Sequence, residues 1–307
     1  MKRFKGVIPA LVSPLDENER INVPVLRRLI EDLLAKGVDG FYLCGATGEG
    51  LALSVEERMR LAEEAIDAVG HRCPCIVQVA ATDFQNAVAL AKHAERIGAD
   101  AISATAPLFF QYDKDDVYEY YKSLAAAVGI PLMAYYSPAA GFAFDAEFAA
   151  RLFTIDNVTA IKWTSSDYYR MMRLRELTQG EMNILNGPDE MLLMGLSAGA
   201  DGGIGTTYNF MPDIILSIYR SFIEGRLSEA RKWQDDACRI IAALHKYKTI
   251  PATKVILEAM GYAVGEATFP MTRYTEAEKR QIISDFCRAG LNISGDNASK
   301  SMKGEDL

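Results

Sequence analysis

Short apolar runs alternate with longer segments of helical periodicity along most of this chain. The runs are mainly apolar and do not alternate regularly between apolar and polar residues, which is typical of parallel strands buried on both faces. Before residue 225 there are eight such runs, and a helical segment follows each of them. The runs are residues 6–12, 40–45, 75–80, 101–106, 131–136, 158–163, 182–187 and 201–207. The helical segments are residues 23–36, 55–69, 84–97, 116–128, 146–153, 167–177, 190–198 and 211–223.

Eight strand–helix pairs favour a closed (β/α)8 barrel, an α/β TIM barrel, over an open doubly wound sheet. After residue 225 the strand pattern stops, and helical segments follow at residues 228–247, 252–260 and 275–289. We therefore predict a barrel over residues 1–225 and a C-terminal helical appendage of three helices, packed on it, over residues 226–290. Residues 291–307 are mostly polar and lack aromatic side chains, so we expect a flexible tail there.

Composition narrows the classes of partner. The net charge of −8 is not accompanied by a basic cluster, so a nucleic-acid partner is not expected. No apolar run approaches the ~20 residues of a membrane span, and we identify no signal peptide. The five cysteines lack metal-ligand spacing, which predicts no metal site and indicates reduced thiols in a cytoplasmic protein. Small molecules are the expected partners.

In a barrel of this kind, chemistry is located where the strands lead into the following loops. Lys162 lies near the end of the sixth apolar run, and two interpretations of it are open. A lysine at such a place can extend its ammonium group into solvent, which is the commoner case for an isolated lysine. An amine removed from water instead disfavours its charged form and, when neutral, can attack a carbonyl carbon.

Two further strand ends carry polar groups. The fifth run ends in YYSP, where Tyr135 is either a proton-transfer group or an ordinary barrel aromatic. The second run leads into CGATGEG at residues 44–50, whose glycines leave backbone N–H groups free to bind a carboxylate or phosphate. A tight turn from strand to helix would explain the same glycines, and no GK[ST] follows to make a P-loop.

The last two strand ends are also polar. Asp189 and Glu190 follow the seventh run just before a helical segment, where carboxylates either cap the helix or bind a ligand. Thr206 follows the eighth run, in GADGGIGTT, and could donate a hydrogen bond to a ligand. Five polar elements on one rim are less consistent with independent structural roles than any one of them alone.

These residues carry a resemblance to a known family. GATGEG, Tyr135 before Pro138, Lys162 at the end of the sixth run and GADGGIG resemble the pyruvate-dependent class I aldolases of the N-acetylneuraminate lyase and dihydrodipicolinate synthase family. The similarity extends from about Phe4 to Ala289. The resemblance implies that Lys162 forms a Schiff base with pyruvate, or with a 2-oxo acid that is cleaved to pyruvate.

The same resemblance implies roles for other residues. Ala46 and Thr47 would hold the pyruvyl carboxylate, and Tyr135 would move a proton between substrate oxygens. No metal or organic cofactor would be needed, and the chain would assemble as a homotetramer built as a dimer of dimers. The family usually has serine or threonine at Ala46, and a tyrosine from a neighbouring subunit at Phe109. Because both positions lack a hydroxyl group, the proton relay would pass through water or Tyr112. Otherwise the substrate would be a different one, whose own groups carry the proton.

The resemblance also bears on the substrate. Dihydrodipicolinate synthases usually place an arginine just after the proline of the fifth loop, whereas this chain reads YYSPAAGF, which disfavours a dicarboxylate. The positions that match the sugar-binding residues of the neuraminate lyases are Thr164, Gly187, Asp189, Glu190, Gly205 and Thr206. Cleavage of N-acetylneuraminate to N-acetylmannosamine and pyruvate is therefore expected. The alternatives are a 2-keto-3-deoxy sugar acid aldolase or dehydratase, a dihydrodipicolinate synthase-like enzyme, and a noncatalytic sensor of 2-oxo acids.

Overall fold

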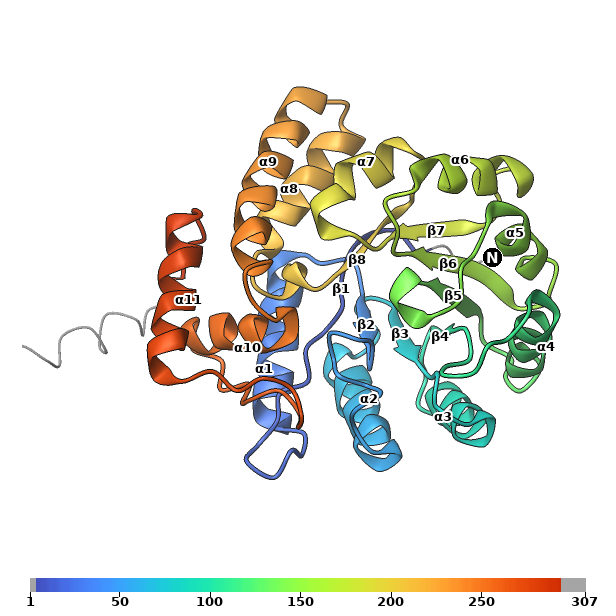
Figure 1. Ribbon diagram of the computed structural model, residues 1–307, viewed down its shortest axis with the longest axis horizontal. Coiled ribbons are helices and arrows are strands. Elements are labelled where there is room, and N and C mark those ends of the chain that lie inside the picture. The colour runs from blue at the N-terminus through green and yellow to red at the C-terminus, as the bar shows by residue number, and fades with distance from the viewer. Residues whose placement is uncertain (1–3, 294–307) are drawn as a thin grey trace, which may run out of the picture.

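Eight parallel strands lie at the centre of the molecule, and helices surround them (Figure 1). This is a computed structural model that describes residues 4–293. The strands are β1 (Gly6–Pro9), β2 (Phe41–Leu43), β3 (Cys75–Gln78), β4 (Ala101–Thr105), β5 (Leu132–Tyr136), β6 (Val158–Trp163), β7 (Asn183–Asn186) and β8 (Gly202–Gly205). They pair in the order β1-β8-β7-β6-β5-β4-β3-β2, and a parallel bridge between Ala10 and Tyr42 joins the two ends of the sheet. The predicted TIM barrel is confirmed.

A helix follows each strand at a place close to the predicted one. The helices of the barrel are α1 (Val23–Lys36), α2 (Val55–Val69), α3 (Phe84–Arg96), α4 (Lys114–Ala125), α5 (Ala146–Leu152), α6 (Tyr168–Leu177), α7 (Leu192–Ser197) and α8 (Pro212–Ile223). Short 3₁₀ turns follow three strands: η1 (Pro138–Ala140), η2 (Asp189–Met191) and η3 (Thr207–Asn209). The seventh helix is thus divided into η2 and α7.

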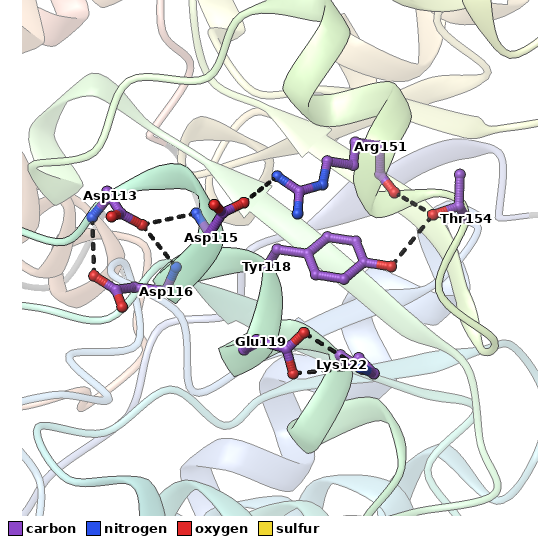
Figure 2. A network of polar contacts seen from close by, with 8 residues as sticks. All are labelled: Asp113, Asp115, Asp116, Tyr118, Glu119, Lys122, Arg151 and Thr154. Carbon is purple, nitrogen blue, oxygen red and sulfur yellow. Dashed lines mark hydrogen bonds and ion pairs between the residues drawn. The ribbon is translucent and has the colours of Figure 1, made fainter.

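Helix α4 is shifted towards the N-terminus relative to the predicted segment, residues 116–128. Its start is fixed by a capping box: the Asp113 carboxylate accepts the N–H groups of Asp115 and Asp116, and the Asp116 carboxylate accepts the N–H of Asp113 (Figure 2). Asp115 also forms an ion pair of 2.6 Å with Arg151 on α5. The helix therefore begins where the cap is made rather than where the apolar pattern begins.

The two faces of the sheet have different neighbours because successive strand residues point to opposite sides. Val7, Phe41 and Ile161 pack between the sheet and the helices. Ile8, Tyr42, Ile76, Ala101, Met133, Tyr135, Ala160, Leu185 and Ile204 belong to a separate cluster inside the barrel. Lys162 lies two residues after Ala160 on the same strand, so its side chain points into the barrel mouth.

Three helices follow the barrel: α9 (Leu227–Leu244), α10 (Thr249–Ala259) and α11 (Glu276–Arg288). They gather on one side, next to α8 and α1 (Figure 1), and Phe286 packs against Phe210 with ring centroids 5.9 Å apart. We propose that the boundary between barrel and appendage lies at residue 225.

The C-terminal segment is only partly described. Leu291 and Ile293, at the start of the expected flexible tail, are buried in the core. The remainder of that tail, residues 294–307, lies outside the described residues. Within residues 4–293 no helix is long and apolar enough to span a bilayer.

Candidate active site

The side chains of Lys162 and Tyr135 meet at the mouth of the barrel. The two residues are register partners on the adjacent strands β6 and β5. Lys162 is 6% exposed and Tyr135 is 8% exposed. The lysine Nζ lies 4.5 Å from the centroid of the Tyr135 ring and 4.5 Å from that of the Tyr42 ring. The amine is thus held away from bulk water and faces two aromatic rings.

Tyr42 is a neighbour of the amine that sequence reasoning did not single out. It lies inside the barrel on β2, and its hydroxyl donates a hydrogen bond of 3.0 Å to Ser103 Oγ. Burial raises the pKa of Tyr42 well above its ordinary value, so this hydroxyl keeps its proton. The alternation of residues along β2 places Tyr42 on the inner face, but its position relative to Lys162 depends on how the barrel closes.

The loop after β2 is tightly built. A Cβ atom at Gly50 would lie 1.9 Å from the Cys44 carbonyl oxygen, so only glycine fits at this position. Ser13 Oγ donates to the Gly48 carbonyl at 2.6 Å, which holds the loop against the segment that follows β1. The Thr47 and Thr206 hydroxyls lie 2.6 Å apart and share a hydrogen bond. The loops after β2 and β8, which both carry predicted site residues, therefore touch.

A pocket of about 440 Å³ opens beside these loops. Five predicted residues contribute to its lining: Thr164, Gly187, Asp189, Glu190 and Thr206. Gly187 is required because a Cβ there would lie 1.9 Å from Thr164 Oγ1. Residues that were not predicted complete the wall: Pro138, Ser165, Ser166, Pro188, Thr207, Ile241, Leu244, His245 and Thr249. The last four come from α9 and α10 or the turn between them, so the appendage forms part of the pocket.

Asp189 is more deeply buried than its neighbour Glu190. Its side chain is 7% exposed, and one carboxylate oxygen accepts the Thr207 N–H at 2.8 Å. The other oxygen lies against Gly205, where a Cβ would approach it to 2.0 Å. Burial raises the pKa of Asp189 to about 6, the Thr207 hydrogen bonds oppose this effect, and the charge of Lys162 opposes it more weakly. Glu190 is half-buried and lines the pocket.

Helix α9 holds the backbone that carries these two carboxylates. Gln234 Nε2 donates to the Asp189 carbonyl at 3.3 Å, and Gln234 Oε1 accepts the Leu193 N–H at 2.9 Å. The Cys238 thiol donates to the Glu190 carbonyl at 3.3 Å. These contacts fix η2 from behind, and the sequence offered no local signal for them.

The remaining predicted residues lie as follows. Ala46 is exposed and Thr47 is 5% exposed, next to each other on the loop after β2. Phe109 is 95% exposed with φ of 78°, and Tyr112 lines a different cavity with Tyr120. Among residues 4–293 no group of three or more His, Cys, Asp or Glu side chains is arranged to hold a metal ion.

The chain is similar to known proteins in both sequence and fold. Residues 3–287 match the profile of the "Dihydrodipicolinate synthetase family". The chain is 33% identical over 276 residues to the N-acetylneuraminate lyase of Rhizobium meliloti (strain 1021), covering 90% of this chain and 92% of that protein. It is 33% identical over 280 residues to the 4-hydroxy-tetrahydrodipicolinate synthase of Syntrophus aciditrophicus (strain SB), covering 91% and 96%. The structure of Proteus mirabilis N-acetylneuraminate lyase superposes with a TM-score of 0.90 at 30% identity, covering 95% of this chain and 100% of that one.

Proposed function

The chain belongs to the dihydrodipicolinate synthetase family of class I aldolases and is a carbon–carbon lyase, and from this premise we propose that it cleaves a 2-oxo sugar acid to pyruvate and an aldehyde. The proposed substrate is N-acetylneuraminate, which would give N-acetylmannosamine and pyruvate. The observation that carries the proposal is the Lys162 amine, held inside the barrel mouth beside Tyr135.

In the proposed reaction Lys162 is the nucleophile. The deprotonated form of its amine attacks C2 of the 2-oxo acid, the oxygen on C2 leaves as water, and a protonated imine forms. This cation withdraws the electron pair of the C3–C4 bond, so that an enamine and an aldehyde result. Protonation of the enamine at C3 and hydrolysis release pyruvate and restore the amine. The faces of the Tyr42 and Tyr135 rings, 4.5 Å from Nζ, favour the cationic imine.

Tyr135 is the proposed proton-transfer group. Breaking the C3–C4 bond requires that the hydroxyl on C4 lose its proton as the aldehyde forms. Tyr135 is the register partner of Lys162, which supports this role because a substrate bound to the amine would have its reacting carbons near the tyrosine. The family resemblance assigns the same role to this tyrosine.

The substrate carboxylate is proposed to bind the backbone N–H groups of Ala46 and Thr47. A Cβ at Gly45, Gly48 or Gly50 would lie within 3 Å of protein atoms, so these glycines permit the tight path of the loop. Ala46 is exposed at this turn, which supports access of a ligand to the backbone there. The shared hydrogen bond between the Thr47 and Thr206 hydroxyls holds the loop in place. A carboxylate seated here would lie at the same mouth as the amine.

The pocket supports a polyhydroxylated tail. Its described lining contains hydroxyl groups and the carboxylates of Asp189 and Glu190, but no lysine or arginine to bind a second carboxylate. Carboxylate oxygens accept hydrogen bonds from several sugar hydroxyls with geometric discrimination. Ile241 and Leu244 add an apolar patch that fits the methyl group of an acetamido substituent. These features favour a sugar acid over the substrate of a dihydrodipicolinate synthase.

Two measurements test the proposal. Borohydride reduction with pyruvate should attach a three-carbon unit to Lys162, and Lys162→Met should abolish labelling and turnover. Labelling of Lys254, which is also buried, or of another lysine would overturn the assignment. Release of pyruvate should then be fastest from N-acetylneuraminate in a panel that includes 2-keto-3-deoxygluconate, with condensation of pyruvate and aspartate semialdehyde as the competing activity. If pyruvate and borohydride label no lysine, the alternative function, a noncatalytic sensor of 2-oxo acids, would be favoured.

The assembly and location are proposed from the same family. We expect a homotetramer, a dimer of dimers, in the cytoplasm. The exposed Phe109 and Phe110, 95% and 69% accessible in the isolated chain, support burial against another subunit. Analytical ultracentrifugation would give the mass of the assembly directly.

A further inference from the structure

The loop after β2 contains a buried ion pair that the proposed mechanism does not use. Glu49 Oε1 lies 2.6 Å from Lys254 Nζ, and the two side chains are 0% and 2% exposed. Glu49 is the glutamate of GATGEG, whereas Lys254 belongs to α10 of the appendage. The pair therefore connects the loop proposed to bind the substrate carboxylate with a helix outside the barrel.

Both side chains have additional partners. Glu49 Oε2 accepts the Thr268 N–H at 2.6 Å, and Lys254 Nζ donates to the Glu266 carbonyl at 2.9 Å. Burial lowers the pKa of Lys254, and the charge of Glu49 opposes that effect. Lys254 is thus held by a carboxylate and a carbonyl, in contrast to Lys162, whose amine faces aromatic rings in the mouth of the barrel.

The backbone of Glu49 explains why this anchor matters for the loop. Glu49 has φ of 56°, in the left-handed region that residues with a Cβ atom rarely adopt, so the surroundings must hold it there. Its N–H donates to the Ala46 carbonyl at 3.0 Å and closes the turn that contains Ala46 and Thr47. A displacement of the Glu49 side chain would therefore also change the orientation of the turn that contains Ala46 and Thr47.

The charge of Glu49 gives a second reason why its pairing with Lys254 matters for the loop. An unpaired Glu49 carboxylate would place a buried negative charge next to a turn that is proposed to receive an anion. Charges interact strongly in the poorly screened interior of a protein, so such an anion would repel the substrate carboxylate. A buried ion pair is by itself weak evidence for stability, because apolar residues of similar volume often stabilise as well.

We propose that Lys254 is a positioning residue for the substrate carboxylate: it anchors and neutralises Glu49, so that the turn at Ala46 and Thr47 presents its N–H groups to an anion. This inference rests on the proposed function. It gives the appendage a part in binding the reacting end of the substrate, at a place distinct from the pocket wall that α9 provides.

The test measures how much pyruvate half-saturates borohydride labelling of Lys162, together with KM and kcat for cleavage. Lys254→Met should raise the half-saturating concentration and KM by about ten- to a hundredfold, the range expected for loss of a hydrogen bond to a charged group. The rate at saturation should change much less. Lys279→Met removes an ion pair of 2.9 Å to Glu276 on the same appendage and is the matched control, with no expected change.

Charge-neutral variants separate this role from stability. Glu49→Gln should leave the half-saturating concentration unchanged or lower it, because the amide carries no charge and can still accept the Thr268 N–H. The double variant Glu49→Gln with Lys254→Met has no unpaired charge, so its half-saturating concentration should lie below that of Lys254→Met alone. A melting temperature lowered by Lys254→Met with unchanged half-saturation would overturn the proposal. If Lys254→Met does not fold, a tenfold increase in the half-saturating pyruvate concentration of the Glu49→Gln variant would overturn the proposal instead. Absence of labelling in the wild type would refute the proposed function rather than this inference.

Discussion

Asp189→Asn is the substitution for which the structure gives the most definite expectation. The Asp189 carboxyl is 7% exposed, accepts the Thr207 N–H at 2.8 Å and has a pKa raised by burial from 3.8 to about 6. Asparagine has nearly the same shape, and its amide oxygen can accept the same N–H. The substitution therefore removes the ionisation of this side chain while it keeps most of the packing against Gly205.

The effect on stability follows from the direction of this change. Because the pKa in the folded protein lies above its ordinary value, the folded state binds the Asp189 proton more tightly than the unfolded state does. The stability due to that proton is fully present below about pH 4 and is lost as the pH rises through about 6. The difference between the two pKa values corresponds to about 3 kcal/mol, at about 1.4 kcal/mol per pH unit. The amide of the Asp189→Asn variant has no proton to lose over this range.

Urea unfolding from pH 4 to pH 7, at one protein concentration, measures this effect. The free energy of unfolding of the Asp189→Asn variant, relative to that of the wild type, should rise by about 2.5 kcal/mol between pH 4 and pH 7, which is most of that difference. The comparison between variants cancels contributions from groups that they share. Parallel profiles for the two proteins would show that burial does not perturb Asp189, and would refute this reasoning.

Two further predictions concern catalysis. Tyr135→Phe keeps the ring beside Lys162 but deletes the hydroxyl, so kcat should fall by about 10²- to 10⁴-fold while labelling of Lys162 by pyruvate persists; a near wild-type rate would assign proton transfer to water or to another tyrosine. Glu190→Gln should lower kcat/KM for the sugar acid by about ten- to a hundredfold, since a hydrogen bond to a charged group contributes about 1.5–3 kcal/mol. Labelling by pyruvate alone should be unchanged in Glu190→Gln, and equal losses in both assays would assign Glu190 a structural role.

The fold was predictable because its signals are local. α1 and α2 have the predicted bounds, and glycines with positive φ follow both, at Gly37 and Gly70. Ser54 caps α2 by accepting the Glu57 N–H. The displaced start of α4 has an equally local cause, the capping box at Asp113, which competes with the apolar pattern as a marker of the helix boundary.

The site was only partly predictable, because strand ends can be located in the sequence whereas contacts across the barrel cannot. The pattern placed Lys162 and Tyr135 on one rim, since the carboxyl ends of parallel strands meet there. It did not indicate that Tyr42 faces the amine, or that Lys254 reaches Glu49. Both contacts join segments far apart in the chain, and only the closure of the barrel and the packing of α10 bring them together.

Asp189 and Glu190 are adjacent in the sequence, yet the sequence alone does not show that their side chains have different surroundings. They are adjacent in η2, and successive residues of a 3₁₀ turn point in directions about 120° apart. One carboxylate consequently turns towards Thr207 and Gly205, while the other is half-buried in the pocket lining. Asp189 uses one oxygen to accept the Thr207 N–H, so it shapes the pocket by fixing the loop after β8, and Glu190 is the side chain of the two with more of its surface free to contact a substrate. Discrimination among sugar acids should therefore depend more on Glu190, and the pH dependence of stability more on Asp189.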